Sequence, residues 1–114
     1  MMNINECYFE DLFSTAFFFD VKEKRMEVYF GEFSTKKHHF DGRCRLVIQG
    51  WENAMSKISS DDKFVDVEEN IGVVSMILNL SEIEGRVEIT VNTLDDRYVD
   101  IVFMSATGWV EKCS

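Results

Sequence analysis

The chain contains no proline, although about six would be usual for a protein of this length. Proline often guards the edge of a sheet because it lacks a backbone N–H, so exposed edges here must be guarded by charged side chains instead. No apolar run approaches the roughly 20 residues of a membrane span, and residues 1–11 have neither a basic region nor a long apolar segment. The sequence therefore predicts neither a transmembrane segment nor a secretory signal.

Cysteine is scarce, and its number is odd. Cys7, Cys44 and Cys113 lack the spacing of a metal site. This pattern favours reduced thiols and hence a cytoplasmic location. Cys44 alternates with Leu46 and Ile48, which predicts that it is a buried apolar residue.

Linear catalytic motifs are lacking as well. The sequence has no Walker pattern, no G-x-S-x-G and no H-E-x-x-H. His38 and His39 are the only histidines, and neighbours on a strand point to opposite faces, so we expect solvated side chains rather than a shared metal ion. The acidic residues 61–69 lack the central glycine and the ligand spacing of an EF-hand loop. We therefore expect no catalytic residue, no metal site and no cofactor, and an enzyme is disfavoured.

Basic residues are too few to balance the acids. Twenty-one acids against twelve bases give a net charge of −9, and residues 61–100 alone hold eleven acids and three bases, a balance of −8. Such a segment repels phosphate groups, so neither a nucleic acid nor an anionic membrane is an expected partner. A basic partner protein is compatible with it, and so is a simple role in solubility.

What the sequence has is apolar alternation, strongest in residues 72–104. Three segments there place apolar residues at every second position: Val74, Met76, Leu78 and Leu80, then Val87, Ile89 and Val91, then Val99, Ile101 and Phe103. Successive side chains of a strand point to opposite faces, so each segment has one apolar face and one largely polar face. The connections at residues 82–85 and 94–97 are short and polar, which predicts an antiparallel meander.

The first half of the chain predicts more strands. Residues 15–22 and 25–33 should pair as a hairpin, and the run of three phenylalanines in the first of them suggests burial on both faces. Asp41-Gly42 predicts a two-residue hairpin turn, followed by a strand over residues 43–49.

Two helices and two minor elements complete the expectation. Apolar residues at helical spacing predict a short helix over residues 5–13 and a second over residues 51–58, which Trp51 would begin. Residues 64–67 should form a brief strand, and residues 109–110 should pack against an edge or an open end.

The predicted fold is a single β-dominated α+β domain spanning residues 1–114. It should have about six to seven antiparallel strands, as a sandwich or half-open barrel, with one or two short helices. The expected core is Val28, Phe30, Leu46, Ile48, Met76, Leu78, Val87, Ile89, Val91, Val99, Ile101 and Phe103. On this basis Leu78→Ala should cost about 2–5 kcal/mol.

The polar parity of the strands provides the candidate binding residues. Tyrosines among carboxylates suit a basic partner, because tyrosine can anchor an interface while acids steer the encounter. The ordinary explanation is that tyrosine is common on the wet face of a sheet. The candidate partner-binding residues are Tyr29, Glu88, Asp95, Asp96, Tyr98 and Asp100.

In general character, the acidic residues 61–100 and the tyrosines Tyr29 and Tyr98 resemble the immunity proteins of bacterial toxin systems. These proteins neutralise a co-encoded toxin, so the resemblance implies a non-catalytic inhibitor of a basic, toxin-like protein. Such proteins have many folds, so the resemblance assigns no functional residues. The alternatives are a small-molecule-binding β-barrel with an apolar cavity, favoured by the many phenylalanines and methionines, and an enzyme lacking a linear motif. An exposed edge of the meander could also pair with a second copy, and the sequence does not fix the oligomeric state.

Overall fold

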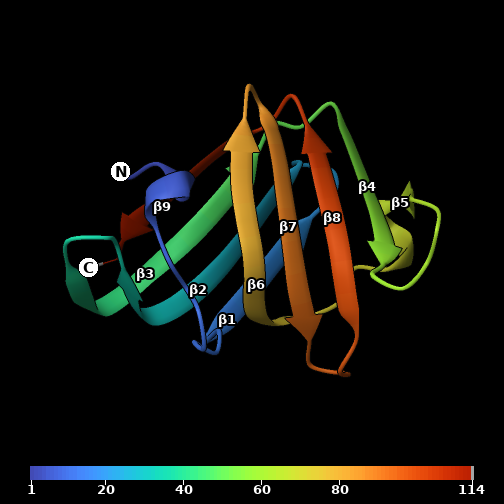
Figure 1. Ribbon diagram of the computed structural model, residues 1–114. Coiled ribbons are helices and arrows are strands. Elements are labelled where there is room, and N and C mark those ends of the chain that lie inside the picture. Colours follow the sequence, from blue (N-terminus) through green and yellow to red (C-terminus); the bar gives the residue numbers. More distant parts are fainter. Residues whose placement is uncertain (114) are drawn as a thin grey trace.

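The computed structural model describes residues 1–113, which form two antiparallel β-sheets that face each other (Figure 1). The elements in chain order are the 3₁₀ turn η1 (Ile4–Glu6), β1 (Ala16–Asp20), β2 (Arg25–Ser34), β3 (His39–Gln49), β4 (Asn53–Ile58), β5 (Val65–Asp66), the 3₁₀ turn η2 (Val67–Glu69), β6 (Val74–Ile83), β7 (Arg86–Thr93), β8 (Tyr98–Met104) and β9 (Thr107–Lys112). One sheet has the order β1-β2-β3-β9 and the other the order β5-β4-β8-β7-β6.

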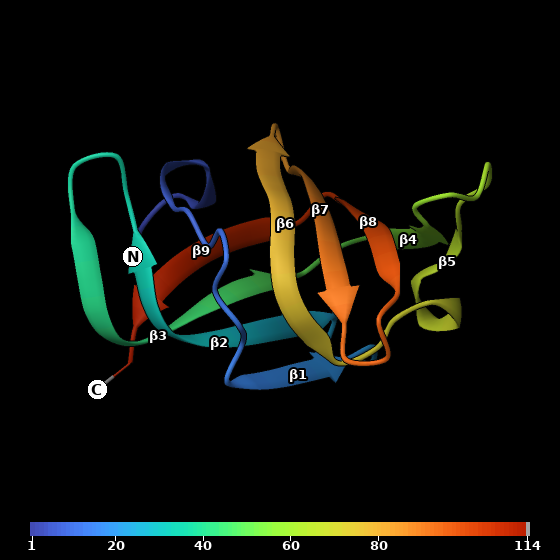
Figure 2. The same cartoon turned by 60° about the horizontal axis from the view of Figure 1, so that its bottom comes forward.

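The expectation of a β-dominated fold with antiparallel sheets is therefore confirmed. The strands of the β6–β8 meander run across those of the sheet behind them rather than along them (Figure 2). The described residues form no closed barrel, and their only helical elements are the two 3₁₀ turns. Within residues 1–113, no helix combines the length and the apolar character needed to cross a membrane.

The core lies between the two sheets, where each sheet contributes the apolar side chains of alternate positions. Ten of the twelve predicted core residues are buried, and Met76 and Leu78 are not. Trp51, in the connection from one sheet to the other, joins the two layers. Its ring lies 5.8 Å from that of Phe19 on β1 and 4.7 Å from that of Phe103 on β8. The connection is therefore packed against both sheets.

The predicted helix over residues 51–58 is wrong, because most of this segment is strand β4, which pairs with β8. Ala54 and Ser56 are buried on the inner face, and Lys57 lies on the outer face. The Ser56 hydroxyl lies 3.2 and 3.3 Å from the carbonyl oxygens of Asp66 and Val67, so its polar group is satisfied inside the protein. A serine at a buried position concealed the strand alternation from sequence reasoning.

The predicted helix over residues 5–13 is also wrong. Only η1 forms, and the side chain of Asn3 caps it by accepting a 2.8 Å hydrogen bond from the Asn5 amide. The following residues are extended, and the Tyr8 amide donates a 2.7 Å bond to the Ser34 carbonyl at the end of β2. Phe9 is buried, with its ring 4.6 Å from that of Phe30, so tertiary packing decides the conformation of this segment.

The Asp41-Gly42 signal marks a β-bulge rather than a turn. The β2–β3 turn lies at residues 35–38, and both Asp41 and Gly42 lie inside β3. Phe30 pairs with Cys44, but Glu32 pairs with Asp41, so the two strands are out of step at this point. Gly42 has a φ of +119°, a conformation that side chains rarely adopt, which explains the glycine.

The edges of the sheets account for two further differences. The three phenylalanines of β1 are not buried on both faces, because β1 is an edge strand and Phe18 is exposed. Residues 107–112 form a full strand, β9, at the opposite edge of the same sheet. Trp109 and Val110 thus do lie at an edge, as expected, but as part of an unpredicted strand. The brief strand expected near residue 65 is present as β5.

Two bulges in β6 overturn the predicted inner face of the first meander strand. The register against β7 shifts between Val74 and Met76 and again between Ile77 and Asn79. Ile77 is consequently 4% exposed, whereas Leu78 is 46% exposed. Regular alternation assigned Leu78 to the core, and an irregular strand does not follow that rule.

We expect Ile77→Ala to lower the free energy of unfolding by about 2–5 kcal/mol, because it removes fully packed methyl groups. Leu78→Ala, its neighbour and matched control, should cost less than about 1 kcal/mol because the side chain is already largely in water. Urea unfolding of both variants measures the difference. A larger cost for Leu78→Ala than for Ile77→Ala would mean that β6 has the regular register.

Candidate functional site

Charge is divided unequally between the two sheets. Residues 50–105, which include every strand of the β5-β4-β8-β7-β6 sheet, contain twelve acids and four bases, a balance of −8. The remaining residues contain nine acids and eight bases, a balance of −1. We call residues 50–105 the acidic layer. Nearly all of the net charge therefore resides on one side of the molecule.

The outer face of the acidic layer presents an open hollow of about 200 Å³. Asp100 on β8 lies opposite Thr90 on β7, whose hydroxyl donates a 2.7 Å hydrogen bond to it. Lys57 Nζ on β4 lies 3.9 Å from the other carboxylate oxygen of Asp100. Glu88 lies two residues before Thr90 on β7, on the same face, and contacts Arg86 at 3.4 Å. The hollow is lined by Phe64, Asn79, Ser81, Glu88, Ile89, Thr90, Asp100, Ile101 and Val102.

The β7–β8 turn carries the two predicted acids at one end of this face. Arg97 Nε lies 2.7 Å from Asp95 Oδ2. Hydrogen bonds from Arg97 and from the Thr93 hydroxyl lower the pKa of Asp95 below its usual value, so its carboxylate stays charged. Asp96 accepts a 3.2 Å bond from Asn92 Nδ2.

Tyr98 begins β8 directly after this turn and is 51% exposed. It pairs with Asn92 across the strands, on the same outer face as Asp100. The structure therefore places Glu88, Asp95, Asp96, Tyr98 and Asp100 on the outer face of the acidic layer and at its β7–β8 end.

Tyr29, the sixth predicted residue, lies elsewhere. It belongs to β2 in the other sheet, and its side chain points to the outer face of that sheet. Its hydroxyl donates a short hydrogen bond to Glu27 and accepts a 3.2 Å bond from Arg45 Nη1. Tyr29 and Tyr98 occupy faces that point in opposite directions, so one partner patch cannot include both.

Sequence reasoning missed the charged network around Glu27, which is only 9% exposed. Arg25 Nε lies 2.5 Å from Glu27, Arg45 Nη1 lies 3.4 Å from it, and Arg45 Nε in turn contacts Glu111 at 2.6 Å. Burial alone would raise the pKa of Glu27, but the hydrogen bonds from Tyr29 and Arg25 and the two guanidinium charges outweigh burial and lower this pKa. Only the pairing of the strands reveals this network, because Glu27, Arg45 and Glu111 come from the three adjacent strands β2, β3 and β9.

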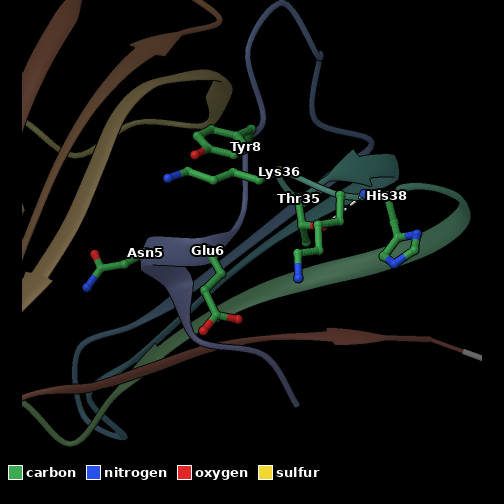
Figure 3. A pocket seen from close by; sticks show the side chains of 7 residues that line it. Asn5, Glu6, Tyr8, Thr35, Lys36 and His38 are labelled. Atoms are coloured by element: carbon green, nitrogen blue, oxygen red, sulfur yellow. Dashed lines mark hydrogen bonds between the residues drawn. The ribbon is translucent and has the colours of Figure 1, made fainter.

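A second, larger hollow of about 440 Å³ lies between the N-terminal segment and the β2–β3 turn. Figure 3 shows Asn5, Glu6 and Tyr8 from the N-terminal segment together with Thr35, Lys36 and His38 from the turn. The exposed Lys36 and Lys37 supply positive charge, and the carboxylate of Glu6 offsets part of it. Within the described residues, neither lysine forms an ion pair that would hold its ammonium group in place. We assign no ligand to this hollow.

The buried thiols offer no nucleophile. Burial raises the pKa of both Cys7 and Cys44 to about 11, so the reactive thiolate is scarce at neutral pH.

Comparisons of the chain with protein-family models, with curated proteins and with solved structures give no match. The argument for function therefore rests on the geometry and charge described above.

The Glu27 network generates a stability prediction. Glu27→Gln should lower the free energy of unfolding at pH 7 by about 1.5–3 kcal/mol, because it removes charge-assisted hydrogen bonds from a buried site. Since folding lowers the pKa of Glu27, its contribution is present above the usual glutamate pKa of about 4.3 and disappears as the pH falls through the lowered value. The difference between wild type and variant should therefore shrink in acid.

Urea unfolding at pH 7 and at pH 3 measures this difference. Glu23→Gln in the exposed β1–β2 turn is the matched control and should change stability little at either pH. If the Glu27→Gln variant matches wild type at pH 7, the network does not stabilise the fold.

Proposed function

We propose that the protein is a non-catalytic, immunity-type inhibitor that binds a basic partner protein through the outer face of the acidic layer. The observation that carries the proposal is the division of charge, with a balance of −8 on residues 50–105 and an exposed tyrosine at one end of the same face. A role in solubility alone would not require the acids to gather on one layer.

The position of the acids favours steering of a partner. Surface charges are screened beyond about 8 Å at physiological ionic strength, so only acids that lie near one another act together on an approaching protein. Asp95, Asp96 and Asp100 lie within one turn and the strand that follows it. Arg97 and Lys57 offset part of this charge, but the acidic layer as a whole keeps a balance of −8, so a basic surface would meet a net negative field, which raises association rates.

Aromatic side chains on this face would supply the anchors. Interface cores are enriched in aromatic residues, and charged residues surround them. Tyr98 is exposed beside the acidic turn, and Phe64 is exposed at the rim of the hollow, with its ring 5.5 Å from Lys57 Nζ. Both rings could pack on a partner while the surrounding carboxylates pair with its lysines and arginines.

The two alternatives have no specific observation in their favour. A small-molecule barrel would need an enclosed apolar cavity, whereas the two hollows described above are open and contain charged side chains. An enzyme would need titratable groups that converge on a substrate site. On the outer face, Asp100 accepts a hydrogen bond from Thr90 and lies near Lys57. These contacts are equally consistent with a structural or a binding role, so they do not favour catalysis.

The first test concerns association. The triple variant Asp95→Asn, Asp96→Asn, Asp100→Asn should slow association with a basic partner and flatten its salt dependence, because it removes the local field. The partner is first captured from a lysate of the source cells, identified and purified. Its association rate is then measured at low and at physiological salt.

The matched control neutralises three exposed acids outside the acidic layer, with Glu10→Gln, Asp11→Asn and Glu23→Gln. It changes the net charge equally but should have a much smaller effect on the rate. Equal effects of the two triple variants, or none from the first, would reduce the acidic layer to a solubility feature.

The second test concerns dissociation. Tyr98→Ala should speed dissociation of the same complex by about 30-fold, which corresponds to about 2 kcal/mol for a buried aromatic anchor. Tyr8→Ala, an exposed tyrosine outside the acidic layer, serves as the control and should leave the rate unchanged. Thermal melts show whether either variant loses its fold. An unchanged dissociation rate for Tyr98→Ala would remove Tyr98 from the interface.

A further inference from the structure

We propose that Glu32, His39 and Asp41 form a binding site for a divalent metal ion, for which zinc is the best match. His39 Nε2 lies 3.1 Å from Asp41 Oδ1 and 3.5 Å from Glu32 Oε1. One ligand atom from each residue lies within 4.8 Å of the other two. Neighbouring ligand atoms of a tetrahedral zinc site with bonds of about 2.0–2.2 Å are about 3.4 Å apart. The two distances from the imidazole to the carboxylates are already close to this spacing.

The bulge between β2 and β3 brings the three residues to one face. Phe30 and Phe33 are both buried, so the chain between them breaks the alternation and turns Glu32 outward. Glu32 is then paired with Asp41, and His39 lies two residues from Asp41 on the same face. With regular alternation from Phe30, Glu32 would point into the core. The bulge thus assembles the cluster on paired strands, where ladder hydrogen bonds fix the backbone.

Ser34 orients the imidazole. It is the cross-strand partner of His39, and its hydroxyl oxygen lies 2.9 Å from His39 Nδ1. When Ser34 accepts a hydrogen bond from Nδ1–H, the lone pair of Nε2 faces the two carboxylates. Metal-ligating histidines commonly have such a partner on their other ring nitrogen, and it fixes both tautomer and ring orientation.

The donor set selects the class of metal. Imidazole nitrogen favours zinc and its first-row neighbours, whereas calcium and magnesium are bound almost entirely by oxygen. Three protein ligands leave at least one position of a tetrahedral ion for water or for another molecule. The Asp41 side chain is 90% exposed, so this open position faces solvent. The site lies outside the acidic layer and does not depend on the function proposed above.

His38 is a natural matched control. It is adjacent in sequence but has different surroundings, because it lines the second hollow (Figure 3) and its ring meets that of Phe40 edge-on at 5.9 Å. Removing either histidine takes one imidazole from the same part of the chain. Only the loss of His39 should remove a ligand.

The test is calorimetric titration of the tag-free protein with a zinc salt. Cys113 is replaced by serine throughout, because it is the least buried thiol and could bind zinc itself. We expect one saturable site per chain. His39→Ala and Asp41→Asn should each weaken zinc binding by at least tenfold, and Ser34→Ala, a positioning change, by about tenfold. His38→Ala should change it by less than about twofold.

Thermal melts in a chelator establish that each variant folds, and added zinc should then raise the melting temperature of wild type and His38→Ala but not of His39→Ala. Asp41→Asn keeps the test decisive if His39→Ala does not fold, because Asp41 is exposed. The proposal is overturned if zinc does not saturate a site in the protein with the Cys113→Ser replacement, or if both histidine variants lose binding equally.

Discussion

Alternate side chains of the strands point into the space between the two sheets, and the two sheets meet along the faces where those side chains gather. Val28 and Phe30 on β2 pack in the same cluster as Ile89 on β7 and Ile101 on β8. The remaining side chains point to the outer faces, where Glu88 and Tyr98 are exposed but Val47 and Glu27 are covered by their neighbours. At the bulges in β2–β3 and β6 the alternation shifts by one residue, so a different set of side chains points into the core.

The meander was predictable because β7 and β8 pair without a bulge and the inward residues that the sequence indicates are buried, although Thr93 and Val102 are buried as well. Three features of the structure could not be predicted from the alternation of apolar and polar residues. Ser56 is a polar residue at a buried position, so β4 resembled a helix face. The bulges in β6 moved Ile77 inward and Leu78 outward. Phe9 and its neighbours adopt an extended path because of the side chains they meet.

The candidate site was predictable to the extent that it depends on local order. Tyr98 and Asp100 are two residues apart on one strand, so their common face follows from the pleat alone. The position of Tyr29 could not be predicted in this way, because it depends on which sheet β2 joins, and the alternation of residues along a strand does not reveal the sheet. The contact of Glu27 with Arg45 and that of Glu32 with Asp41 depend on the cross-strand register, including a bulge. A cluster built across strands becomes visible only when the pairing is known.

The uneven division of charge also gives the molecule an electric dipole in addition to its net negative charge. A protein of this kind rotates as it nears any charged surface, so its first contact has a preferred orientation. On a positively charged support it would settle with the acidic layer downward and the β1-β2-β3-β9 sheet away from the support. The same net charge spread evenly over both sheets would have no such directional behaviour.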